Sequence, residues 1–521
     1  MLPEQSRRLE TTFIVATLFA ASCLFLLNLA NHYLWQDEAQ TALISKTILT
    51  HGVPLGYDGK NYLSQELGAE YGENYLWRWH TWLPFYVAAA SFRLFGANTF
   101  SARLPFALFG IGTVVLAYFF AKSLWKSPRA GVVTSTLLLL SVPFIILSRQ
   151  SRYYSMAAFF SLLCLYAYAN ILERKKYSHV VFVVSATLLF HTHYIYCATL
   201  LVTVVLHTLL CHRDAARKVV LSSAVVVAIS LPFIIWLAGI RYGDRYGTGL
   251  FDAARVAGSG KKYFLHVVTH VFSPLLLLVP ACVGAANWIR TKSLFPKDAV
   301  VWNKLFLLIL FIALNVIALS LTSPAPFFRY LAPLIPVLYV ITGFIINSAM
   351  NVHVALGPVL MAVLVFMSPL SDYLYEITHD YDGPIEGISK YLNDNGNRDD
   401  TVAITYGDLP LKFYTSMRVV GGLTGEDLAP AKKAEWIILR NHVICRKDYN
   451  VLQYLLKNVP WHMYQRITID YPDIPFENRE SPDEHRFRTT IDASKVAVFR
   501  RVKNSRGQGN SPSRKYPDVR Q

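Results

Sequence analysis

Charged residues are scarce in this chain of 521 residues: they make up 16% of it, against roughly 25% in an ordinary soluble domain. Hydrophobic residues account for 53%. A chain with this balance cannot cover a large water-exposed surface, which excludes a wholly soluble protein. Apolar stretches recur from residue 12 to residue 370, and a bilayer core takes about 20 apolar residues per helix. The composition therefore predicts an all-α polytopic membrane domain.

Several chemical signatures are missing as well. The six cysteines have neither the spacing of a disulfide framework nor that of a metal site, so no metal ligands are predicted from them. The sequence has no Gly-rich phosphate loop, which excludes a nucleotide site of that type. It also lacks the internal repeats that many transporters have.

Acidic residues are outnumbered: 34 aspartates and glutamates stand against 50 lysines and arginines, a net charge of +16. The basic residues lie in short loops between the apolar stretches, as the positive-inside rule predicts for cytoplasmic loops. Membrane lipid is the expected partner of this charge, and no nucleic acid partner is expected. The same rule places the N-terminus, with Arg7 and Arg8, in the cytoplasm.

Two stretches decide how often the chain crosses the membrane. Residues 179–211 as one helix span about 50 Å, more than a core of about 30 Å, so we expect two crossings with an outer turn at His191 and His193. Residues 82–96 are short and contain Arg93, so we expect an amphipathic helix in the interface. About eleven crossings follow. They are residues 12–33, 104–125, 130–148, 155–172, two within 179–211, 219–238, 271–289, 304–322, 330–349 and 354–370.

The predicted domains follow from this path. Residues 1–370 form the membrane domain, whose first outer loop, 35–81, is acidic and contains interfacial helices; 239–270 is another outer loop. Residues 371–502 alternate between short apolar strands and helices, which predicts a small periplasmic α/β domain. The expected helices are 384–395, 409–415 and 448–457, and the expected strands are 401–405, 436–439 and 496–502. Residues 503–521 are expected to be a disordered basic tail.

An acidic pair, Asp37 and Glu38, follows the first apolar stretch directly. Carboxylates are costly to place at the edge of the hydrocarbon, so they mark a candidate functional site. A partly desolvated aspartate there can act as a general base. The structural alternative is that Asp37 caps a helix running from Glu38 to Leu49.

Two outer segments carry arginines suited to binding phosphate. Arg149 and Arg152 lie in the run from Ser148 to Ser155, and Arg329 precedes the tenth crossing. A guanidinium donates in a planar fork that matches phosphate oxygens. Snorkelling into lipid head groups is the alternative. Lys261 is a weaker candidate, with a solvated face as its alternative reading.

Histidines and tryptophans near the outer face have two readings each. His191 and His193 bind a metal or substrate, or are hydrogen-bonded turn residues; without a nearby acid or cysteine they are a poor zinc signature. His80 and its neighbouring tryptophans form an interfacial anchor or stack on a sugar. The polar run 477–487 is an ordered loop with ion pairs, or it reaches the acceptor. These alternatives stay open.

The order of these motifs resembles the GT-C membrane glycosyltransferases, in the branch of the protein O-mannosyltransferases and the lipid A aminoarabinose transferases. The resemblance covers about residues 10–345. It rests on Asp37-Glu38, Leu83-Pro84-Phe85-Tyr86, Arg93-Leu94-Phe95-Gly96, Arg103-Leu104-Pro105, Phe109-Gly110, Ser148–Ser155 and Arg329-Tyr330-Leu331-Ala332-Pro333-Leu334-Ile335-Pro336.

This resemblance implies a lipid-linked donor, a polyprenyl monophosphate sugar. It implies that Asp37 is the catalytic carboxylate and Glu38 its partner. It also places Arg152 and Arg329 near the donor phosphate. Arg149 and Tyr153 join that predicted site by proximity, and the predicted substrate-binding residues are His193, Tyr330 and Lys261. The chain has Tyr153-Tyr154-Ser155 where relatives carry an aspartate, so no metal site is predicted and a divalent cation stays an open alternative.

The leading hypothesis is transfer of a sugar from a polyprenyl-phosphate donor to a lipid, glycan or protein acceptor, on the outer face of a bacterial inner membrane. The first alternative is a polytopic lipid or glycan transporter or flippase, which predicts ionisable pairs near the bilayer midplane. The second is an assembly protein whose active part is the outer domain. The acidic pair at the membrane edge favours the transferase.

Overall fold

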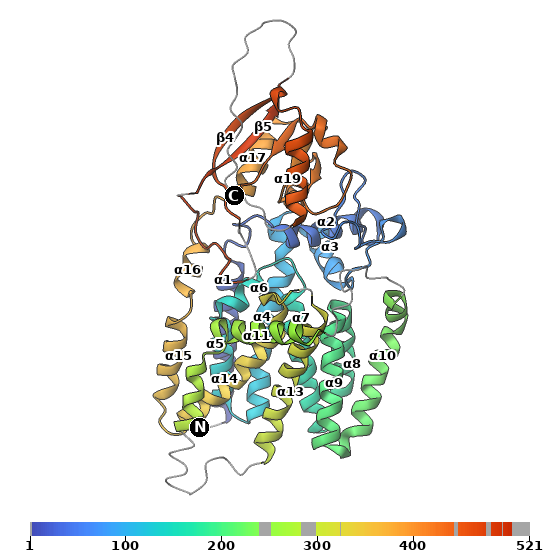
Figure 1. Cartoon of the computed structure of the whole chain (residues 1–521). Coiled ribbons are helices and arrows are strands. Elements are labelled where there is room, and N and C mark those ends of the chain that lie inside the picture. Colours follow the sequence, from blue (N-terminus) through green and yellow to red (C-terminus); the bar gives the residue numbers. More distant parts are fainter. Residues whose placement is uncertain are drawn as a thin grey trace, which may run out of the picture. The chain divides into compact units, whose positions relative to one another are not determined.

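The computed structural model describes residues 3–238, 252–282, 299–323, 325–441, 446–475, 481–491 and 493–502 (Figure 1). The predicted tail, 503–521, lies outside the described residues, as do parts of the predicted loop 239–270 and crossing 271–289. The chain folds into two compact units. The helical unit comprises residues 1–30, 80–379 and 480–487, and the mixed unit comprises residues 31–79, 380–479 and 488–521.

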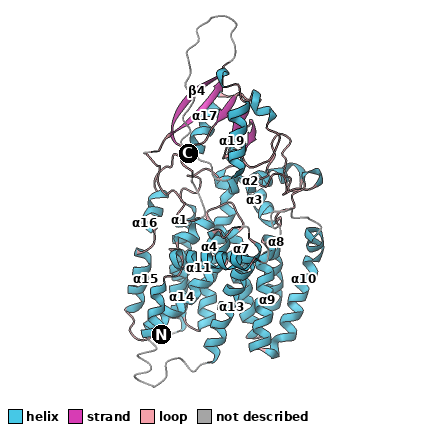
Figure 2. Cartoon of the chain, viewed as in Figure 1, coloured by secondary structure: helices cyan, strands magenta, loops and turns pink. Residues whose placement is uncertain are grey.

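Long apolar helices make up the helical unit (Figure 2). Six of the described helices are long and apolar enough to cross a membrane, and the number rises to nine if each bent pair is one span. The chain is thus a multi-pass membrane protein. The helices are α1 (Pro3–Leu26), α3 (Leu83–Phe95), α4 (Thr99–Trp125), α5 (Pro128–Leu139), α6 (Val142–Ser148), α7 (Tyr154–Leu172), α8 (Ser178–Thr192), α9 (Tyr194–Cys211), α10 (Ala216–Ala238), α11 (Ala253–His270), α13 (Ala299–Thr322), α14 (Leu334–Met350), α15 (Leu356–Phe366) and α16 (Leu370–Glu376).

Two predictions about the membrane path are confirmed as secondary structure. The expected interfacial segment 82–96 is the helix α3. The run 179–211 is two helices, α8 and α9, separated by a break at His193, whose φ of −164° and ψ of 107° are extended. The shorter apolar helix α14 coincides with one further predicted crossing, 330–349. The total of eleven crossings stays a prediction.

The helical unit contains a sharp bend between two consecutive helices. The helices α5 and α6 meet at 65°, where the Ser141 side chain accepts from the backbone N–H of Phe144 and Pro143 starts the new helix.

Residues 253–270 of the predicted loop form the amphipathic helix α11, which the sequence reading missed. The Asp252 carboxylate caps it by accepting from the N–H groups of Ala254 and Arg255. In Figure 1 this helix runs across the upright helix α13.

A five-stranded sheet forms the centre of the mixed unit, in the order β2-β1-β3-β5-β4. The first three strands pair in parallel, and β5 is antiparallel to both of its neighbours. Every element predicted for residues 384–502 is confirmed: α17 (Pro384–Asn395), β1 (Thr401–Ile404), α18 (Asp408–Tyr414), β3 (Trp436–Ile438), α19 (Arg446–Asn458) and β5 (Lys495–Arg501). The sequence reading missed β2 (Arg418–Gly421) and β4 (Tyr464–Pro472).

The segment predicted as the first outer loop packs with this sheet. Its main helix, α2 (Gln36–His51), lies against α18. Buried Asn61 covers the edge strand β2: its side chain accepts from the N–H of Val419 at 2.8 Å and donates to the carbonyl of Met417 at 3.3 Å. The predicted boundary at residue 370 stays a prediction, but the contacts group residues 31–79 with the C-terminal segment.

Candidate functional site

The acidic pair lies in the first turn of α2. The N-cap position is Trp35, which makes no side-chain cap, so the alternative reading of Asp37 as the helix cap is wrong. Asp37 is 8% exposed and Glu38 is fully buried. The positive end of the helix dipole favours carboxylates in a first turn. The structure therefore places both predicted carboxylates in a buried, electrostatically favourable position.

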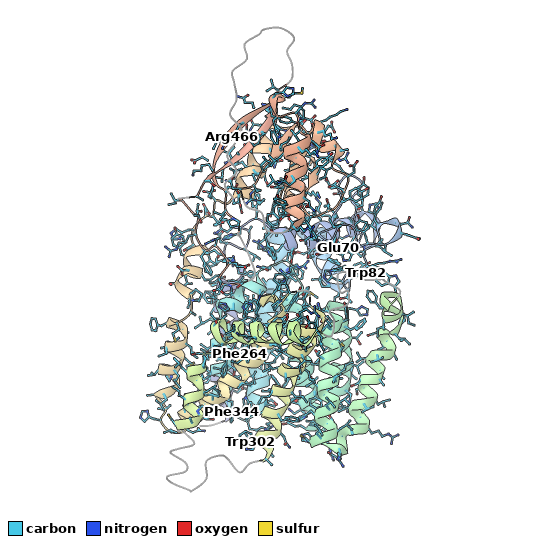
Figure 3. The ribbon with its side chains drawn as sticks, viewed as in Figure 1. Glu70, Trp82, Phe264, Trp302, Phe344 and Arg466 are labelled. Atoms are coloured by element: carbon cyan, nitrogen blue, oxygen red, sulfur yellow. The ribbon has the colours of Figure 1, made fainter. Side chains whose placement is uncertain are left out.

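Glu70 is a third buried acid in the same unit, and the sequence reading missed it (Figure 3). Its carboxylate accepts from the side chain of Gln40 at 2.9 Å, from the N–H of Glu66 at 2.9 Å, and from the Ser64 hydroxyl. Burial raises the pKa of Glu70, and these hydrogen bonds oppose the rise. Because Gln40 is on α2, this carboxylate fixes the middle of the helix that carries Asp37.

The two arginines between α6 and α7 are both buried but do different things. Arg149 donates to the carbonyls of Leu27 at 2.8 Å, Asn28 at 3.0 Å and Phe25 at 3.2 Å. These carbonyls lie at the C-terminal end of α1, where a helix leaves acceptors without intrahelical partners and favours cations. Arg149 therefore joins α1 to the turn before α7.

Arg152 lies in an aromatic cluster instead. Its guanidinium is 5.8 Å from the centre of the Tyr153 ring. That ring lies 4.7 Å from the ring of His193, in the break between α8 and α9. The His193 ring in turn lies 4.4 Å from Tyr196, whose hydroxyl donates to the carbonyl of Tyr330 at 3.0 Å. Residues predicted from three separate segments thus come together.

Arg329 and Lys261 are less closely tied to this cluster. Arg329 is half-buried beside it, with its guanidinium 4.2 Å from the Phe327 ring and 5.5 Å from the Tyr330 ring. Lys261 is exposed on α11. The predicted site thus gathers around Arg152, Tyr153, His193 and Tyr330.

An apolar groove adjoins the break between α8 and α9. Its volume is about 610 Å³, and its lining includes Trp82, which Figure 3 labels. The ring of Trp82 meets those of Phe233 and Trp236 edge-on, and the ring centres of His191 and Phe233 are 5.4 Å apart. The lining residues are Trp82, Leu83, Tyr86, Leu188, His191, Ile229, Pro232, Phe233 and Trp236. Such a lining suits a hydrocarbon chain.

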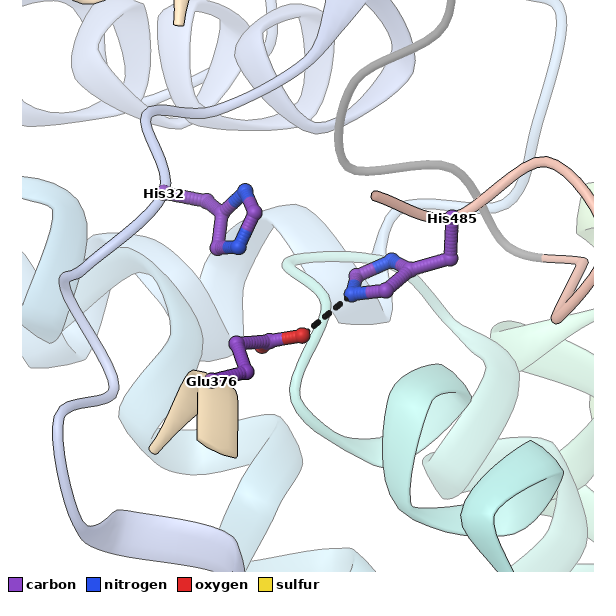
Figure 4. A group of neighbouring side chains, drawn as sticks. All are labelled: His32, Glu376 and His485. Atoms are coloured by element: carbon purple, nitrogen blue, oxygen red, sulfur yellow. Dashed lines mark hydrogen bonds and ion pairs between the residues drawn. The ribbon is translucent and has the colours of Figure 1, made fainter. Parts of the chain in front are cut away.

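Part of the predicted polar loop is described, and it carries the expected ion pairs. His485 and Glu376 are both buried, with 2.5 Å between Nε2 and Oε2 (Figure 4). Asp483 lies 2.9 Å from His270 at the end of α11. Residues 477–480 lie outside the described part. The segment is thus fixed to the helical unit by two histidine–carboxylate contacts.

Within the described ranges, neither His191 nor His193 belongs to a group of three ligating side chains close enough to hold one ion. Both lie among aromatic rings, at Phe233 and Tyr153 respectively.

The chain is similar to known membrane glycosyltransferases. The sequence profile of the family described as dolichyl-phosphate-mannose-protein mannosyltransferase matches residues 79–236. The undecaprenyl phosphate-alpha-4-amino-4-deoxy-L-arabinose arabinosyl transferase 1 of Pseudomonas fluorescens is 32% identical over 137 residues, 26% of this chain and 22% of that protein. A relative of the same description in Pseudomonas aeruginosa is 30% identical over 138 residues, again 26% and 22%. The matches thus span about a fifth of these relatives.

Solved structures match over nearly the whole chain. ArnT from Cupriavidus metallidurans, solved bound to undecaprenyl phosphate, covers 94% of this chain and 98% of its own, with a TM-score of 0.57 at 13% identity. The oligosaccharyltransferase AglB of Archaeoglobus fulgidus, solved with an inhibitory peptide and a dolichol-phosphate, covers 92% and 75%, with a TM-score of 0.57 at 11% identity. The chain therefore has the fold of the GT-C glycosyltransferases, and the resemblance predicted from its sequence is confirmed.

Proposed function

We propose that this protein transfers a sugar from a polyprenyl-phosphate donor to a hydroxyl or amine on a lipid, glycan or protein acceptor. The observation that carries the proposal is the cluster of Arg152, Tyr153, His193 and Tyr330, in which a buried guanidinium lies beside the Tyr153 ring and that ring packs on His193. The matched family, described by a dolichyl-phosphate-mannose donor, and a solved relative bound to undecaprenyl phosphate support the class of donor.

The residues divide the chemistry between them. Asp37 is the general base that takes the proton from the acceptor, and Glu38 orients or assists it. The acceptor oxygen or nitrogen bonds to the anomeric carbon while the bond from that carbon to the phosphate oxygen breaks, with inversion. Arg152 and Arg329 neutralise the charge that develops on the departing polyprenyl phosphate. Tyr153 and His193 exclude water beside the phosphate.

The apolar groove is where the isoprenoid tail of the donor lies. Its lining is almost wholly hydrocarbon and aromatic, and about 610 Å³ is enough for several isoprene units. His191 in the groove is two residues from His193 in the cluster, which supports placing the tail next to the phosphate.

The proposed setting is a bacterial inner membrane. The N-terminus lies in the cytoplasm, as the basic loops predict, and the mixed unit lies on the periplasmic side. In this orientation the enzyme binds its polyprenyl-phosphate sugar on the outer face of the membrane, and it needs no nucleotide-linked donor there.

Replacement of Asp37 by asparagine tests the proposal. The full chain in lipid vesicles is given a polyprenyl-phosphate pentose or hexose and a membrane extract as acceptor, and release of polyprenyl phosphate is measured. Asp37→Asn is expected to lower the rate by about 10²–10⁴-fold, as for loss of a general base. Glu73→Gln, an exposed acid of the same loop, is the matched control. If Asp37→Asn turns over as fast as Glu73→Gln, Asp37 is not the base.

A further inference from the structure

We infer that the mixed unit positions the catalytic carboxylates, and that its residues Glu386, Asp408 and Tyr414 are positioning residues for the transfer reaction. The three side chains come from α17 and α18 and bind the segment that leads into α2. This inference rests on the proposed function, because it gives the C-terminal residues a role in the chemistry of Asp37. It gives the mixed unit a task other than contacting an acceptor: it holds Asp37 and Glu38 in place.

Two of the contacts hold the backbone just before α2. The N–H of Tyr33 donates to the Glu386 carboxylate at 2.6 Å, and the N–H of Leu34 donates to the Tyr414 hydroxyl at 2.8 Å. The rings of Tyr33 and Tyr414 also stack, with their centres 3.9 Å apart. Backbone donors in a buried segment require partners. Here the partners are side chains 353 and 380 residues away in the sequence.

The third contact holds the first residue of the helix. The Gln36 side-chain amide donates to the Asp408 carboxylate at 2.8 Å. The other oxygen of Asp408 lies 2.9 Å from the Lys412 ammonium, which also donates to the carbonyl of Tyr62 at 2.9 Å. All of these side chains are buried, so the network is shielded from water and each member restricts the next.

Close packing leaves the Asp408 carboxylate little freedom to move. A Cβ on Gly422 would lie 1.9 Å from one of its oxygens, so only glycine fits at 422. The φ of Gly422 is +62°, which also favours glycine. Asp408 is therefore held between the loop after β2 and the start of α2.

Together the contacts fix Tyr33, Leu34 and Gln36, the residues that set where α2 begins. Asp37 and Glu38 follow at once, so the direction of their side chains depends on these anchors. A catalytic base must reach the acceptor proton within hydrogen-bond distance, and small displacements have large effects on rate. A purely structural role for the same contacts predicts lower stability but an unaltered rate per folded molecule.

Replacement of Tyr414 by phenylalanine is the most direct test. It removes one hydroxyl and keeps the ring stacked on Tyr33. We expect kcat to fall about tenfold, the KM for a polyprenyl-phosphate sugar to stay unchanged, and the pH profile of kcat to shift, since the surroundings of the base have changed. Tyr449→Phe, an exposed tyrosine on α19, is the matched control. Equal kcat values and pH profiles for the two variants would overturn the inference.

A pair of variants at Glu386 separates positioning from folding. Glu386→Gln keeps an oxygen that can accept from the Tyr33 N–H, whereas Glu386→Leu does not. At equal folded fraction, judged by thermal unfolding of the full chain, the glutamine variant is expected to keep most of the rate and the leucine variant to lose about tenfold. Equal rates for these two variants would contradict positioning, even if Tyr414→Phe proves unstable.

A double variant tells this inference apart from the proposed function. If Asp37 is the base, Tyr414→Phe in an Asp37→Asn background should cause little further loss, because there is no base left to misplace. Full activity of the Asp37→Asn variant would disprove the proposed mechanism itself. Inactive Asp37→Asn together with fully active Tyr414→Phe would leave the mechanism standing and remove only the positioning role.

Discussion

The carboxylate region of the mixed unit and the arginine region of the helical unit are held in place by different forces. The start of α2 and the backbone just before it donate directional hydrogen bonds to side chains that lie more than 350 residues later in the sequence. The cluster around Arg152 is held by packed aromatic rings from α7, α9 and the breaks beside them. A catalytic base must point its carboxylate in one direction, which hydrogen bonds to its helix provide. A phosphate pocket instead needs a defined shape and few water molecules, which packed rings provide.

Within the arginine region, Arg149 and Arg152 sharpen the same contrast. They are three residues apart and similarly buried. One guanidinium donates to the carbonyls at the end of α1, and the other lies over an aromatic ring. Chemically identical side chains in one turn thus have separate tasks.

The largest expected effects come from replacing each arginine by glutamine. Arg152→Gln should lower the transfer rate by about 10²-fold without a change in unfolding temperature, because one donor to the developing phosphate charge is lost. Arg149→Gln should destabilise the helical unit by about 3 kcal/mol, because buried carbonyls lose a charged donor. Rate and thermal unfolding in detergent are measured for both. If the two variants lose transfer rate and stability in the same proportion, Arg149 and Arg152 do not have separate roles.

The next effect concerns the ring nitrogens of His193. His193→Phe keeps the aromatic contacts with Tyr153 and Tyr196 but removes both nitrogens. We expect about tenfold weaker binding of polyprenyl phosphate, if an imidazole hydrogen bond to phosphate contributes about 1.4 kcal/mol. Binding is measured by titration with undecaprenyl phosphate. His462→Phe, an exposed histidine, is the control, and equal affinities would show that only the ring shape matters.

Filling the apolar groove should have a smaller and more selective effect. Ile229→Trp places a large ring in the groove and should raise the KM for a long-chain donor by about threefold to tenfold, as expected when apolar contact worth about 1 kcal/mol is lost. A donor with two isoprene units should be unaffected. Val227→Trp, on α10 but outside the groove lining, is the control. Equal changes for long and short donors would place the tail elsewhere.

The smallest effect concerns pH and the mixed unit. Because burial raises the pKa of Glu70, the folded chain keeps this proton at pH values where the unfolded chain has lost it. Stability should therefore fall as pH rises from the ordinary carboxyl value of 4.5 toward the raised value. Glu70→Gln should flatten that dependence. Thermal unfolding at pH 4.5 and pH 7 measures it, and an identical slope in the variant would refute the assignment.

Much of the fold could be predicted from periodicity. Helices such as α17 and α19 have one apolar face, and strands such as β1 and β3 are short apolar runs between polar turns. The strand β2 was missed because four residues after a helix give too little pattern. The helix α11 was missed because the glycines and lysines in it are typical of a loop.

The candidate site could be predicted only in part. Composition marks Asp37, Arg152 and Arg329, because charged side chains beside apolar runs are costly and need a reason. Only the family resemblance singled out Arg152; local sequence does not distinguish it from Arg149, since the difference lies in which carbonyls the chain brings near. Glu70 and Asp408 were missed because isolated acids in polar segments have no local signature.

The sequence by itself determined that the chain crosses a membrane, that the run 179–211 breaks near His193, and which charged residues stand at the edge of the apolar runs. These follow from local hydrophobicity and backbone preference, which act over a few residues. Only the tertiary structure decided that α17 and α18 hold the start of α2, that one arginine binds the end of a helix while its neighbour lies among rings, and that residues 481–487 pack with the helical unit. Such pairings depend on which distant groups can satisfy one another once water is excluded, and no short window of sequence contains that information.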